Sequence, residues 1–552
     1  GGYCRDMEKI CKNCQAPFSI TPDELGMYEK LEMSEPKICV NCRWQAHLGF
    51  WVFGKFRKGK SDLSGESLIT TLPVKPPFPV YTSKEWLSDT WEAPEMDYDL
   101  SRPFFEQLRE LQSKTPHPHQ TGINNTNSDW CDDVWDCKNC YLSRSMVNCE
   151  ELLYGYRNIR VTNSADTTYC YDSEKCYDLT YCFNCFNTRH SFDTRDAINS
   201  AFLFDCRNVQ DSFMCWNLRN KQYCILNQHH TKEEYKKKMA EINFGSRKII
   251  EKLKAEFETI LRAQAVHREN VNLKTFDSRG NYMTNCNRCE NAFYWEDSED
   301  CYNCLRGIRM KSAIDVTGTF DSELTGNLAN SFGGYMWKYA NWSSNCRFSE
   351  YLDQCVRCEN CFGCVGLKDK KFCILNKQYS EEEYKKLREQ IIASMKQDKT
   401  YGDFLPWSMA YSGYNISSAQ IYFPLTKEEA MNKGLPWDEV ADSHVDGISP
   451  DELPDDIKDA KDEITTQALI CPETHYRFNI APRELEFYRM MRIPLPRAHS
   501  DHRNLERFKK LAVITSYLYH CLYCTKEVQA YYPPAWGYQK IACEACYQRE
   551  IS

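Results

Sequence analysis

Four cysteines near the beginning of the chain have the spacing of a metal site. Cys11-x2-Cys14 and Cys39-x2-Cys42 are two pairs of thiols, and the segment between them is long enough to fold back as a hairpin. Two such pairs supply the four thiolates that tetrahedral Zn²⁺ prefers. With four protein ligands and no position left for water, this zinc site would be structural rather than catalytic.

The same arrangement recurs near the other end of the chain. Cys521-x2-Cys524 and Cys543-x2-Cys546 again form two pairs of thiols at a spacing that suits zinc. The sequence therefore predicts a ribbon with a structural Zn²⁺ at each end, and at least two zinc ions in all.

A third segment, which starts at Cys471, aligns with the first ribbon but changes its ligands. Thr474 takes the place of Cys14, while His499 and His502 take those of Cys39 and Cys42, and His475 could supply a fourth ligand. Zinc there and a degenerate ribbon that keeps its shape without metal both remain open.

The middle of the chain is duplicated. A shift of 149 residues aligns KQYCILNQHHTKEEYKKKMAEI, from Lys221, with KKFCILNKQYSEEEYKKLREQI, from Lys370, and pairs several cysteines. Inside each copy many cysteines lie nine residues apart, beside recurring Asn and Asp. Short units with a small inward residue and a turn former are typical of the stacked coils of a β-solenoid. Each coil would place a cysteine above a cysteine of a neighbouring coil; whether a coil holds two units or three stays open.

One group of repeat cysteines has a zinc-like spacing of its own: Cys286, Cys289, Cys301 and Cys304. In the first copy, however, the last two correspond to Leu152 and Gly155, so the quartet is not part of the duplicated pattern. Because a free cysteine behaves as a small buried hydrophobe, buried thiols are the favoured interpretation. Metal that bridges neighbouring coils is the alternative.

Both copies end in a predicted helix. Thr231 with Glu234, and Ser380 with Glu383, form capping boxes that precede apolar residues at helical spacing. The first helical pattern continues toward Val266. We expect these helices to cap the end of the repeat, where strand edges would otherwise be unpaired.

A P-loop pattern, Gly54-KFRK-Gly59-Lys60-Ser61, lacks the preceding strand and following helix that nucleotide binding requires. No Ser-His-Asp or Cys-His constellation stands out either. The motifs therefore favour a protein that binds over one that catalyses.

Composition and charge narrow the class of protein further. The chain has 552 residues, 31 cysteines and a net charge of −9, and it is too long for a single core. No segment is apolar enough for a membrane span, and the beginning of the chain lacks the apolar core of a signal peptide. We therefore expect a cytoplasmic protein with reduced thiols, against the alternative of an oxidised, secreted scaffold. The acidic run from Asp438 to Glu463 indicates a solvated linker, and a mildly basic stretch follows Cys471.

The predicted fold is mainly β: a duplicated, cysteine-rich, β-solenoid-like repeat domain with capping helices and small zinc ribbons at both ends. The expected segments are an N-terminal ribbon at 1–60, a linker with a helix at 61–127, repeat copy 1 at 128–227, a helical insert at 228–276, repeat copy 2 at 277–376, a helix and acidic linker at 377–466, and the variant ribbon plus the Cys4 ribbon at 467–552.

Several strings give the chain a resemblance to a family: KICKNCQAPFSI, KSDLSGE, SRPFFEQLRELQ, LRNKQYCILN, LKDKKFCILN, YFPLTKEEAMNKG, LEFYRMMRIPLPR and CEACYQREI. Nearly end to end, it resembles the uncharacterised cysteine-rich zinc-ribbon proteins of candidate-phyla bacteria. The resemblance implies that Cys11, Cys14, Cys39 and Cys42 are zinc ligands. It also implies that Thr474, His499 and His502 belong to a variant ribbon pattern. It implies no reaction and no partner.

The leading functional hypothesis is a non-enzymatic binding scaffold that contacts nucleic acid or a ribonucleoprotein through its ribbons, since its many aromatic residues could stack on bases. The alternatives are a protein–protein or homo-oligomeric assembly scaffold, and a metal or redox enzyme that uses the cysteine ladder. No membrane partner is expected.

Overall fold

The computed structural model describes residues 6–170, 172–318, 320–439 and 446–552. The chain forms two compact units: unit 1 comprises Gly1–His119 and Asn270–Glu439, and unit 2 comprises Gln120–Glu269 and Val440–Ser552. Strands hold 33% of the residues and helices 25%, so the protein is mainly β, as predicted. Each unit combines one end of the chain with one copy of the repeat.

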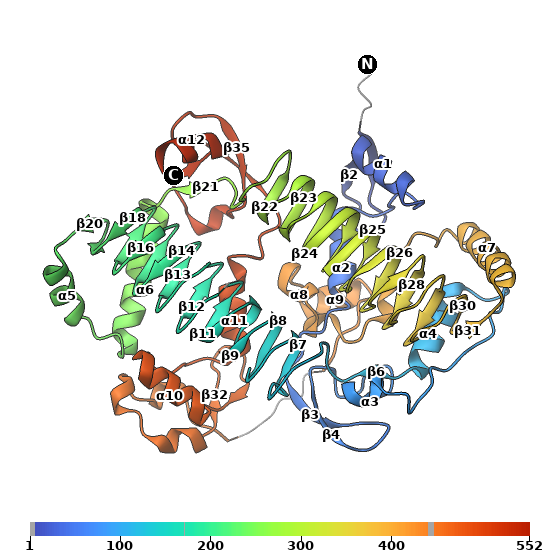
Figure 1. Ribbon diagram of the computed structural model, residues 1–552, viewed down its shortest axis with the longest axis horizontal. Coiled ribbons are helices and arrows are strands. Elements are labelled where there is room, and N and C mark those ends of the chain that lie inside the picture. Colours follow the sequence, from blue (N-terminus) through green and yellow to red (C-terminus); the bar gives the residue numbers. More distant parts are fainter. Residues whose placement is uncertain (1–5, 171, 319, 440–445) are drawn as a thin grey trace. The chain divides into compact units, whose positions relative to one another are not determined.

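A large sheet of short, mostly parallel strands forms the centre of unit 2, and its strands follow one another in a row in Figure 1. Partners lie twelve residues apart, as in Cys131 with Ser143 and Leu203 with Cys215. The strands are β7 (Cys131–Trp135), β8 (Ser143–Val147), β9 (Glu150–Leu153), β10 (Tyr156–Ile159), β11 (Thr162–Thr168), β12 (Tyr177–Thr180), β13 (Arg189–Phe192), β15 (Ala201–Phe204), β17 (Phe213–Trp216), β19 (Cys224–Ile225) and β20 (Gln228–His229). A second, three-stranded parallel sheet consists of β14 (Arg195–Ile198), β16 (Arg207–Gln210) and β18 (Arg219–Gln222).

Unit 1 contains the corresponding sheet from the second copy. The same twelve-residue step pairs Cys289 with Cys301 and Leu352 with Cys364. Its strands are β22 (Arg279–Thr284), β23 (Asn287–Glu296), β24 (Glu299–Val316), β25 (Phe320–Leu328), β26 (Gly334–Asn341), β27 (Cys346–Arg347), β28 (Glu350–Asp353), β29 (Phe362–Val365), β30 (Cys373–Ile374) and β31 (Lys377–Gln378).

The backbone bends at nearly every third residue of both copies. Asn139 and Asn148 in copy 1, and Asn285 in copy 2, have φ of 54°. A left-handed conformation costs an L-residue about 1–2 kcal/mol, and Asn and Asp tolerate it best, which explains their recurrence. The residue after each bend points inward; Cys140 and Cys149, for example, are 3% and 1% exposed. The core of each copy is therefore built from every third residue.

The nine-residue cysteine spacing has a different meaning from the one expected. Cysteines nine apart are not paired across strands; instead the thiol of one donates to the carbonyl oxygen of the other. Cys140 Sγ donates to Lys138 O (3.5 Å) and to Cys149 O (3.6 Å), and Cys355 Sγ donates to Cys364 O (3.3 Å). Among the described residues, cysteines that lie above one another are twelve residues apart, as Cys289 and Cys301 are. All described cysteines are free thiols.

The helices begin where their capping boxes predict. Thr231 caps α5 (Lys232–Ala240) and Ser380 caps α7 (Glu381–Gln397), each with its reciprocal glutamate. The helical pattern toward Val266 is interrupted, because a new helix, α6 (Arg247–Ala263), begins after Gly245. Helix α6 lies against the sheet of copy 1, where Phe257 packs on Phe202, so it covers a face of that sheet. In unit 1, α4 (Phe104–Lys114) packs its apolar side on β29.

The described part of the acidic run is folded. Residues 440–445, which include Asp442, lie outside the described residues. From 446 on, short 3-10 turns at Pro450–Glu452, Ile457–Asp459 and Asp462–Thr466 bury Leu453 and Ile457 in an apolar cluster. The prediction of a solvated linker missed these apolar side chains.

Unit 1 also contains two short helices, α8 (Ala419–Tyr422) and α9 (Lys427–Asn432), 3-10 turns at Trp407–Met409 and Tyr414–Ile416, and the short strand β6 (His117–Pro118). Within the described ranges, no helix combines the length and the apolar composition that crossing a bilayer would take.

Candidate metal centres

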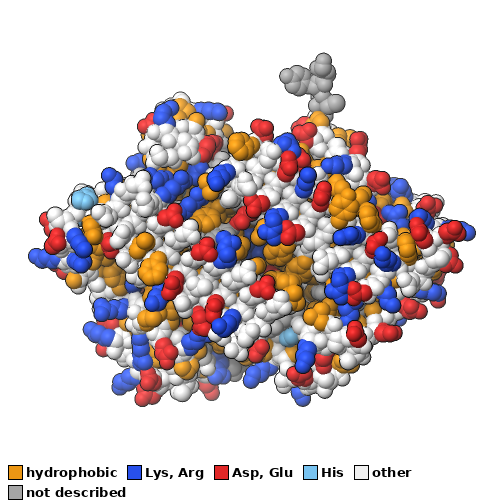
Figure 2. Space-filling model, in the orientation of Figure 1, with side chains coloured by type: hydrophobic (Ala, Val, Ile, Leu, Met, Phe, Trp, Pro, Cys, Tyr) orange, Lys and Arg blue, Asp and Glu red, His pale blue; other side chains and the backbone are white. Residues whose placement is uncertain are grey.

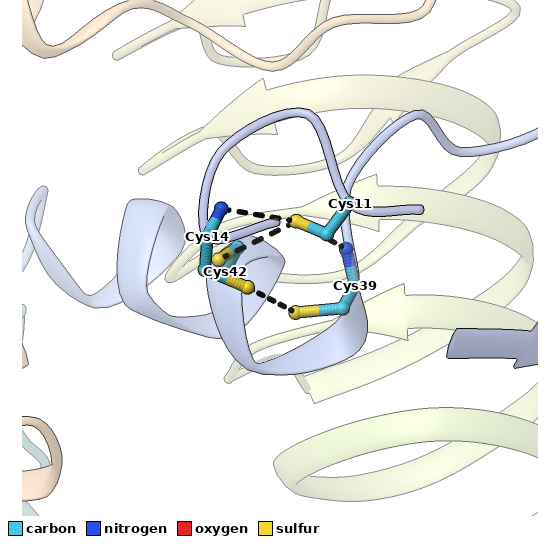
Figure 3. Close-up of side chains that lie close together, drawn as sticks. All are labelled: Cys11, Cys14, Cys39 and Cys42. Carbon is cyan, nitrogen blue, oxygen red and sulfur yellow. Dashed lines mark hydrogen bonds between the residues drawn. The ribbon is translucent and has the colours of Figure 1, made fainter. Parts of the chain in front are cut away.

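The first ribbon, residues 6–48, brings its four predicted ligands together. Strands β1 (Met7–Ile10) and β2 (Pro17–Ile20) form a hairpin whose turn carries Cys11 and Cys14. Helix α1 (Pro22–Lys30) follows, and Cys39 is the N-cap of α2 (Val40–Leu48), which places Cys42 in its first turn. The four sulfurs lie within 4.8 Å of one another and point toward a common centre (Figure 3).

The distances between these sulfurs fit a tetrahedral ion. Cys11 Sγ lies 3.8 Å from Cys42 Sγ, and Cys14 Sγ lies 3.7 Å from Cys39 Sγ. A tetrahedron with bonds of about 2.3 Å, the Zn–S length, has edges of about 3.8 Å. The donor set is therefore arranged for a small metal ion that prefers thiolates.

Backbone N–H groups favour the thiolate form of Cys11. Burial raises the pKa of Cys11, but the N–H groups of Cys14 and Cys39 donate to its sulfur at 3.5 and 3.2 Å and bring the net pKa below its usual value. The pKa of Cys39 is lowered to about 5, mainly by the hydrogen bond with the side chain of Cys42. Thiolate is the form that binds metal.

The fourth ribbon, residues 517–550, repeats this arrangement in unit 2. Strands β34 (Tyr517–His520) and β35 (Glu527–Ala530) flank the first pair of cysteines, and β36 (Ile541–Ala542) leads into α12 (Glu544–Glu550), which Cys543 caps. The four sulfurs again lie within 4.8 Å, with Cys524 Sγ 3.8 Å from Cys543 Sγ. Burial raises the pKa of Cys521, yet N–H groups of Cys543 and Cys524 lower it to about 6 overall.

The third ribbon, residues 469–509, has the predicted shape without a gathered ligand set. Its strands β32 (Leu469–Ile470) and β33 (Arg477–Phe478) and its helices α10 (Pro482–Met491) and α11 (Ser500–Lys509) match those of the first ribbon in order. Cys471 Sγ donates to Glu473 Oε2 (3.3 Å), and His499 Nδ1 accepts the N–H of Asp501 (3.1 Å) as a helix cap. His475 is exposed. Within the described residues, Cys471, His475, His499 and His502 do not form a group of ligand atoms within 4.8 Å.

A second ribbon, residues 57–87, was missed by the sequence analysis. Strands β3 (Arg57–Lys60) and β4 (Ser67–Thr70) form a hairpin, so the P-loop pattern at 54–61 includes all of β3 and ends at Ser61, where the turn begins. Ser61 and Ser64 occupy the turn, β5 (Val80–Tyr81) follows, and Thr82 caps α3 (Ser83–Leu87). Ser61 also follows Cys11 by the same fifty residues as Cys521 follows Cys471. That spacing was the signal in the sequence, but the residue types concealed it.

Hydrogen bonds replace the thiols at the centre of the second ribbon. Ser61 Oγ donates to Glu85 Oε2 (2.5 Å), and Thr82 Oγ1 donates to the same oxygen (3.0 Å). Burial raises the pKa of Glu85, but the hydroxyls of Ser61, Ser64 and Thr82 lower it to about 2. A carboxylate therefore takes the place of the fourth cysteine.

All four ribbons share one turn geometry. The N–H of the first turn residue donates to the backbone carbonyl of the residue five positions later, as Cys11 N–H does to Ala16 O (2.9 Å). The fifth turn residue donates back to the carbonyl of the first and is left-handed: Gln15, Gly65, His475 and Thr525, with φ of 62°, 77°, 57° and 59°. The shape of the turn is thus independent of whether its side chains can bind metal.

The first and third ribbons also dock in the same way. Arg43 of the first ribbon pairs with buried Asp315 of copy 2 at 2.9 Å. Arg503 and Arg507 of the third ribbon pair with buried Asp166 of copy 1 at 3.5 and 3.1 Å. Asp166 and Asp315 correspond under the 149-residue shift. Each unit therefore holds one ribbon on its repeat copy through the same buried carboxylate.

The repeat cysteines with zinc-like spacing lie in the core of copy 2. Cys286, Cys289, Cys301 and Cys304 are at most 1% exposed. Cys286 Sγ donates to Thr284 O (3.4 Å) and Cys301 Sγ to Glu299 O (3.5 Å). No metal-type group of their ligand atoms within 4.8 Å occurs in the ranges that the structure describes. Their contacts are those of buried thiols.

The fold and the centres together define a ribbon-bearing, cysteine-rich parallel β protein. No protein-family model and no curated protein matches this chain. Its function therefore has to be argued from its own residues.

Proposed function

We propose that each cysteine quartet holds one structural Zn²⁺ and that the protein is a non-enzymatic binding scaffold. The observation that carries this proposal is the closed geometry of both quartets, with sulfur–sulfur distances of 3.7–3.8 Å. Four thiolates leave no coordination position for water or substrate. A tetrahedral S₄ set suits zinc or iron, and zinc fits a ribbon that only has to be held in shape.

We further propose that the two repeat copies are coils of a β-solenoid with twelve residues per coil. The twelve-residue step between parallel partners, and the inward position of every third residue, support this. Such a stack is rigid and offers long side faces to a partner. Membership of the candidate-phyla zinc-ribbon family and a cytoplasmic location belong to the same proposal.

Metal analysis tests the zinc assignment. Purified protein should be colourless and contain two zinc ions per chain. Cys11→Ser and Cys521→Ser should each lower the content to one, while the control Cys137→Ser, a change to a buried repeat thiol, should leave it at two. A brown preparation that contains iron would overturn the assignment and favour the redox-enzyme alternative.

A protein-binding role has an observation of its own. The fourth ribbon exposes three apolar side chains close together in sequence, Leu518 (58%), Leu522 (45%) and Tyr523 (39%). Exposed apolar groups of this kind suit contact with a protein or with a second copy of the chain. Light scattering should then show self-association that Leu518→Ser with Leu522→Ser abolishes; a monodisperse monomer in both cases would exclude homo-oligomer formation.

A further inference from the structure

Three arginines lie in register on one side face of copy 1. The register of β14, β16 and β18 places Arg195 beside Arg207, and Arg207 beside Arg219. Neighbouring strands are about 4.8 Å apart, and like charges directly opposite one another destabilise a sheet. An arrangement that costs stability requires an explanation outside the fold itself.

The three arginines differ in how they are neutralised. Arg219 pairs with Asp205 at 3.3 Å and also contacts Tyr547 Oη of the fourth ribbon. Arg195 lies with its guanidinium 4.9 Å from the centre of the Phe183 ring. Arg207 makes no side-chain hydrogen bond or ion pair with any residue that the structure describes, although it is only partly exposed. Burial and the charges of Arg219 and Arg195 lower its pKa, against Tyr547 and Asp205, which raise it.

The nearest acids do not offset this charge. Asp205 is already engaged by Arg219 and by Tyr547. Burial, reinforced by Asp205, raises the pKa of Asp193 to about 7, so Asp193 is only partly ionised at neutral pH. In Figure 2, Lys and Arg side chains gather between the C-terminal ribbon and the end of the copy 1 sheets, which belong to the same unit.

Aromatic side chains continue the same face. Parallel β-bridges pair Phe183 with Arg195 and Phe186 with Ile198, twelve residues apart, as in the rest of the repeat. Phe186 is 43% exposed and Ile198 is 40% exposed. Cationic groups that follow a backbone, next to rings on which bases can stack, are the two components of a surface for single-stranded nucleic acid.

Copy 2 shows that the fold does not require this ladder. The 149-residue shift places Ser344 and Val356 at the positions of Arg195 and Arg207. Only the third position keeps its charge: Lys368 donates to Trp86 O (2.7 Å) of the second ribbon and lies 4.7 Å from the Trp91 ring centre. The third position thus anchors a ribbon in both units, whereas the first two are basic in copy 1 alone.

We propose that Arg195 and Arg207 bind the phosphates of a single-stranded nucleic acid whose bases stack on Phe186. This rests on the proposed function, because it specifies the partner and the face of the scaffold that contacts it. Phosphate contacts of this kind fix position without selecting sequence.

Fluorescence anisotropy with a labelled, mixed-sequence 12-nucleotide single-stranded RNA, at several salt concentrations, tests the proposal on the full chain. Because each phosphate contact on a single strand contributes about 0.7 to the slope of log K against log salt, Arg195→Gln with Arg207→Gln should reduce that slope by about 1.4. Lys236→Gln with Lys237→Gln removes the same charge from exposed positions on α5 and should leave the slope unchanged. Phe186→Ala should weaken RNA binding at least fivefold but leave inorganic polyphosphate binding unaltered.

Equal slopes for the arginine variant and its control would overturn the proposal, as would binding of poly-glutamate as tight as that of RNA, which would point to an acidic protein instead. Thermal unfolding should show that the arginine variant remains folded, since removing like charges relieves repulsion. Its zinc content should stay at two ions. Loss of RNA binding with two zinc ions retained is therefore distinct from failure of the zinc assignment, in which metal is absent whatever the RNA does.

Discussion

Cys11 and Ser61 occupy the same position in two hairpins of unit 1. Each donates its N–H across the turn, to Ala16 O and Glu66 O at 2.9 and 2.8 Å. At the centre of the first ribbon four sulfurs surround a metal-sized space, whereas at the centre of the second a single carboxylate, that of Glu85, accepts hydroxyl hydrogen bonds. The same backbone turn can therefore carry either four sulfurs with the spacing of a metal site or hydrogen bonds to one acid.

The comparison also separates two roles of a ribbon. Docking on the repeat uses residues outside the metal centre, such as Arg43 in the first ribbon and Arg503 in the third. A ribbon that has lost its ligands can therefore keep its place on the repeat. This explains why the third ribbon retains Arg503 at the position of Arg43 while Thr474 replaces Cys14.

Removal of metal should give the largest difference between the ribbons with cysteine quartets and the second ribbon. Structural zinc contributes about 10–16 kcal/mol of apparent binding free energy at neutral pH in small zinc-finger peptides. A strong chelator should therefore abolish the amide protection of the first and fourth ribbons. Hydrogen exchange followed by mass spectrometry should show residues 57–87 of the second ribbon unchanged.

Equal loss of protection in all four ribbons would contradict this difference. Readdition of Zn²⁺ supplies the control, because it should restore protection in the first and fourth ribbons only.

The buried docking carboxylates should give the next largest effect. Asp315→Asn leaves Arg43 buried without its counter-charge. Asp166→Asn removes the carboxylate that Arg503 and Arg507 share, although Arg507 keeps Asp178 at 4.0 Å. Removing one partner of a buried ion pair costs about 3–5 kcal/mol. Each substitution should destabilise its own unit by that amount, as measured by hydrogen exchange of the strands in that unit.

The matched control is Asp321→Asn, which breaks the exposed pair with Arg309 and should cost less than about 1 kcal/mol. A similar cost for Asp321→Asn and Asp315→Asn would show that the buried pair does not hold the ribbon.

The hydrogen-bonded centre of the second ribbon should be less costly to disturb. Glu85→Gln removes the charge that Ser61 and Thr82 stabilise and should cost about 1 kcal/mol; Lys84→Gln, on the same helix but exposed, should cost nothing measurable. Because the pKa of Glu85 is lowered from 4.5 to about 2, its contribution is fully present above pH 4.5 and is lost as the pH falls through 2.

Acid titration sharpens the contrast with the first ribbon. Protons compete with metal for thiolates, so metal affinity falls as the pH falls. Hydrogen exchange at stepwise lower pH should show the first ribbon opening before the second. The reverse order would mean that Glu85 does not stabilise its turn.

The two terminal cysteine quartets and the shape of the third ribbon could be predicted from the sequence, because each leaves a spacing that few residue types satisfy. Helix α10 begins at Pro482 as α1 begins at Pro22, in agreement with the alignment of the two ribbons. The second ribbon could not be found in this way, since Ser61, Thr82 and Glu85 are common in any turn or helix start. The second ribbon begins fifty residues after the first. That distance is informative only when it is compared with the same distance between the third and fourth ribbons.

The register of the repeat was hidden by the cysteines themselves. Parallel partners lie twelve residues apart and inward residues recur every three, so a residue nine positions on is the inward residue just before the parallel partner. The nine-residue spacing therefore marks a hydrogen bond to that residue, such as the one from Cys140 to Cys149. The informative signal was the period of three, in which Asn or Asp precedes an inward residue. Tyr, Arg and Leu also occupy left-handed positions here, as at Tyr223 and Arg157, and that weakened the signal.

The smallest expected effect on stability concerns one left-handed position that the two copies share. Leu226 and Leu375 correspond under the 149-residue shift and have φ of 49° and 45°, but Leu226 is 48% exposed while Leu375 is fully buried. Glycine relieves the left-handed strain at both positions, at the cost of a more flexible unfolded chain. Leu226→Gly should therefore raise the free energy of unfolding by up to about 1 kcal/mol, whereas Leu375→Gly should lower it because the apolar contacts of the buried side chain are lost. Urea unfolding of each variant measures both signs, and a destabilising Leu226→Gly would show that the exposed bend carries no relievable strain.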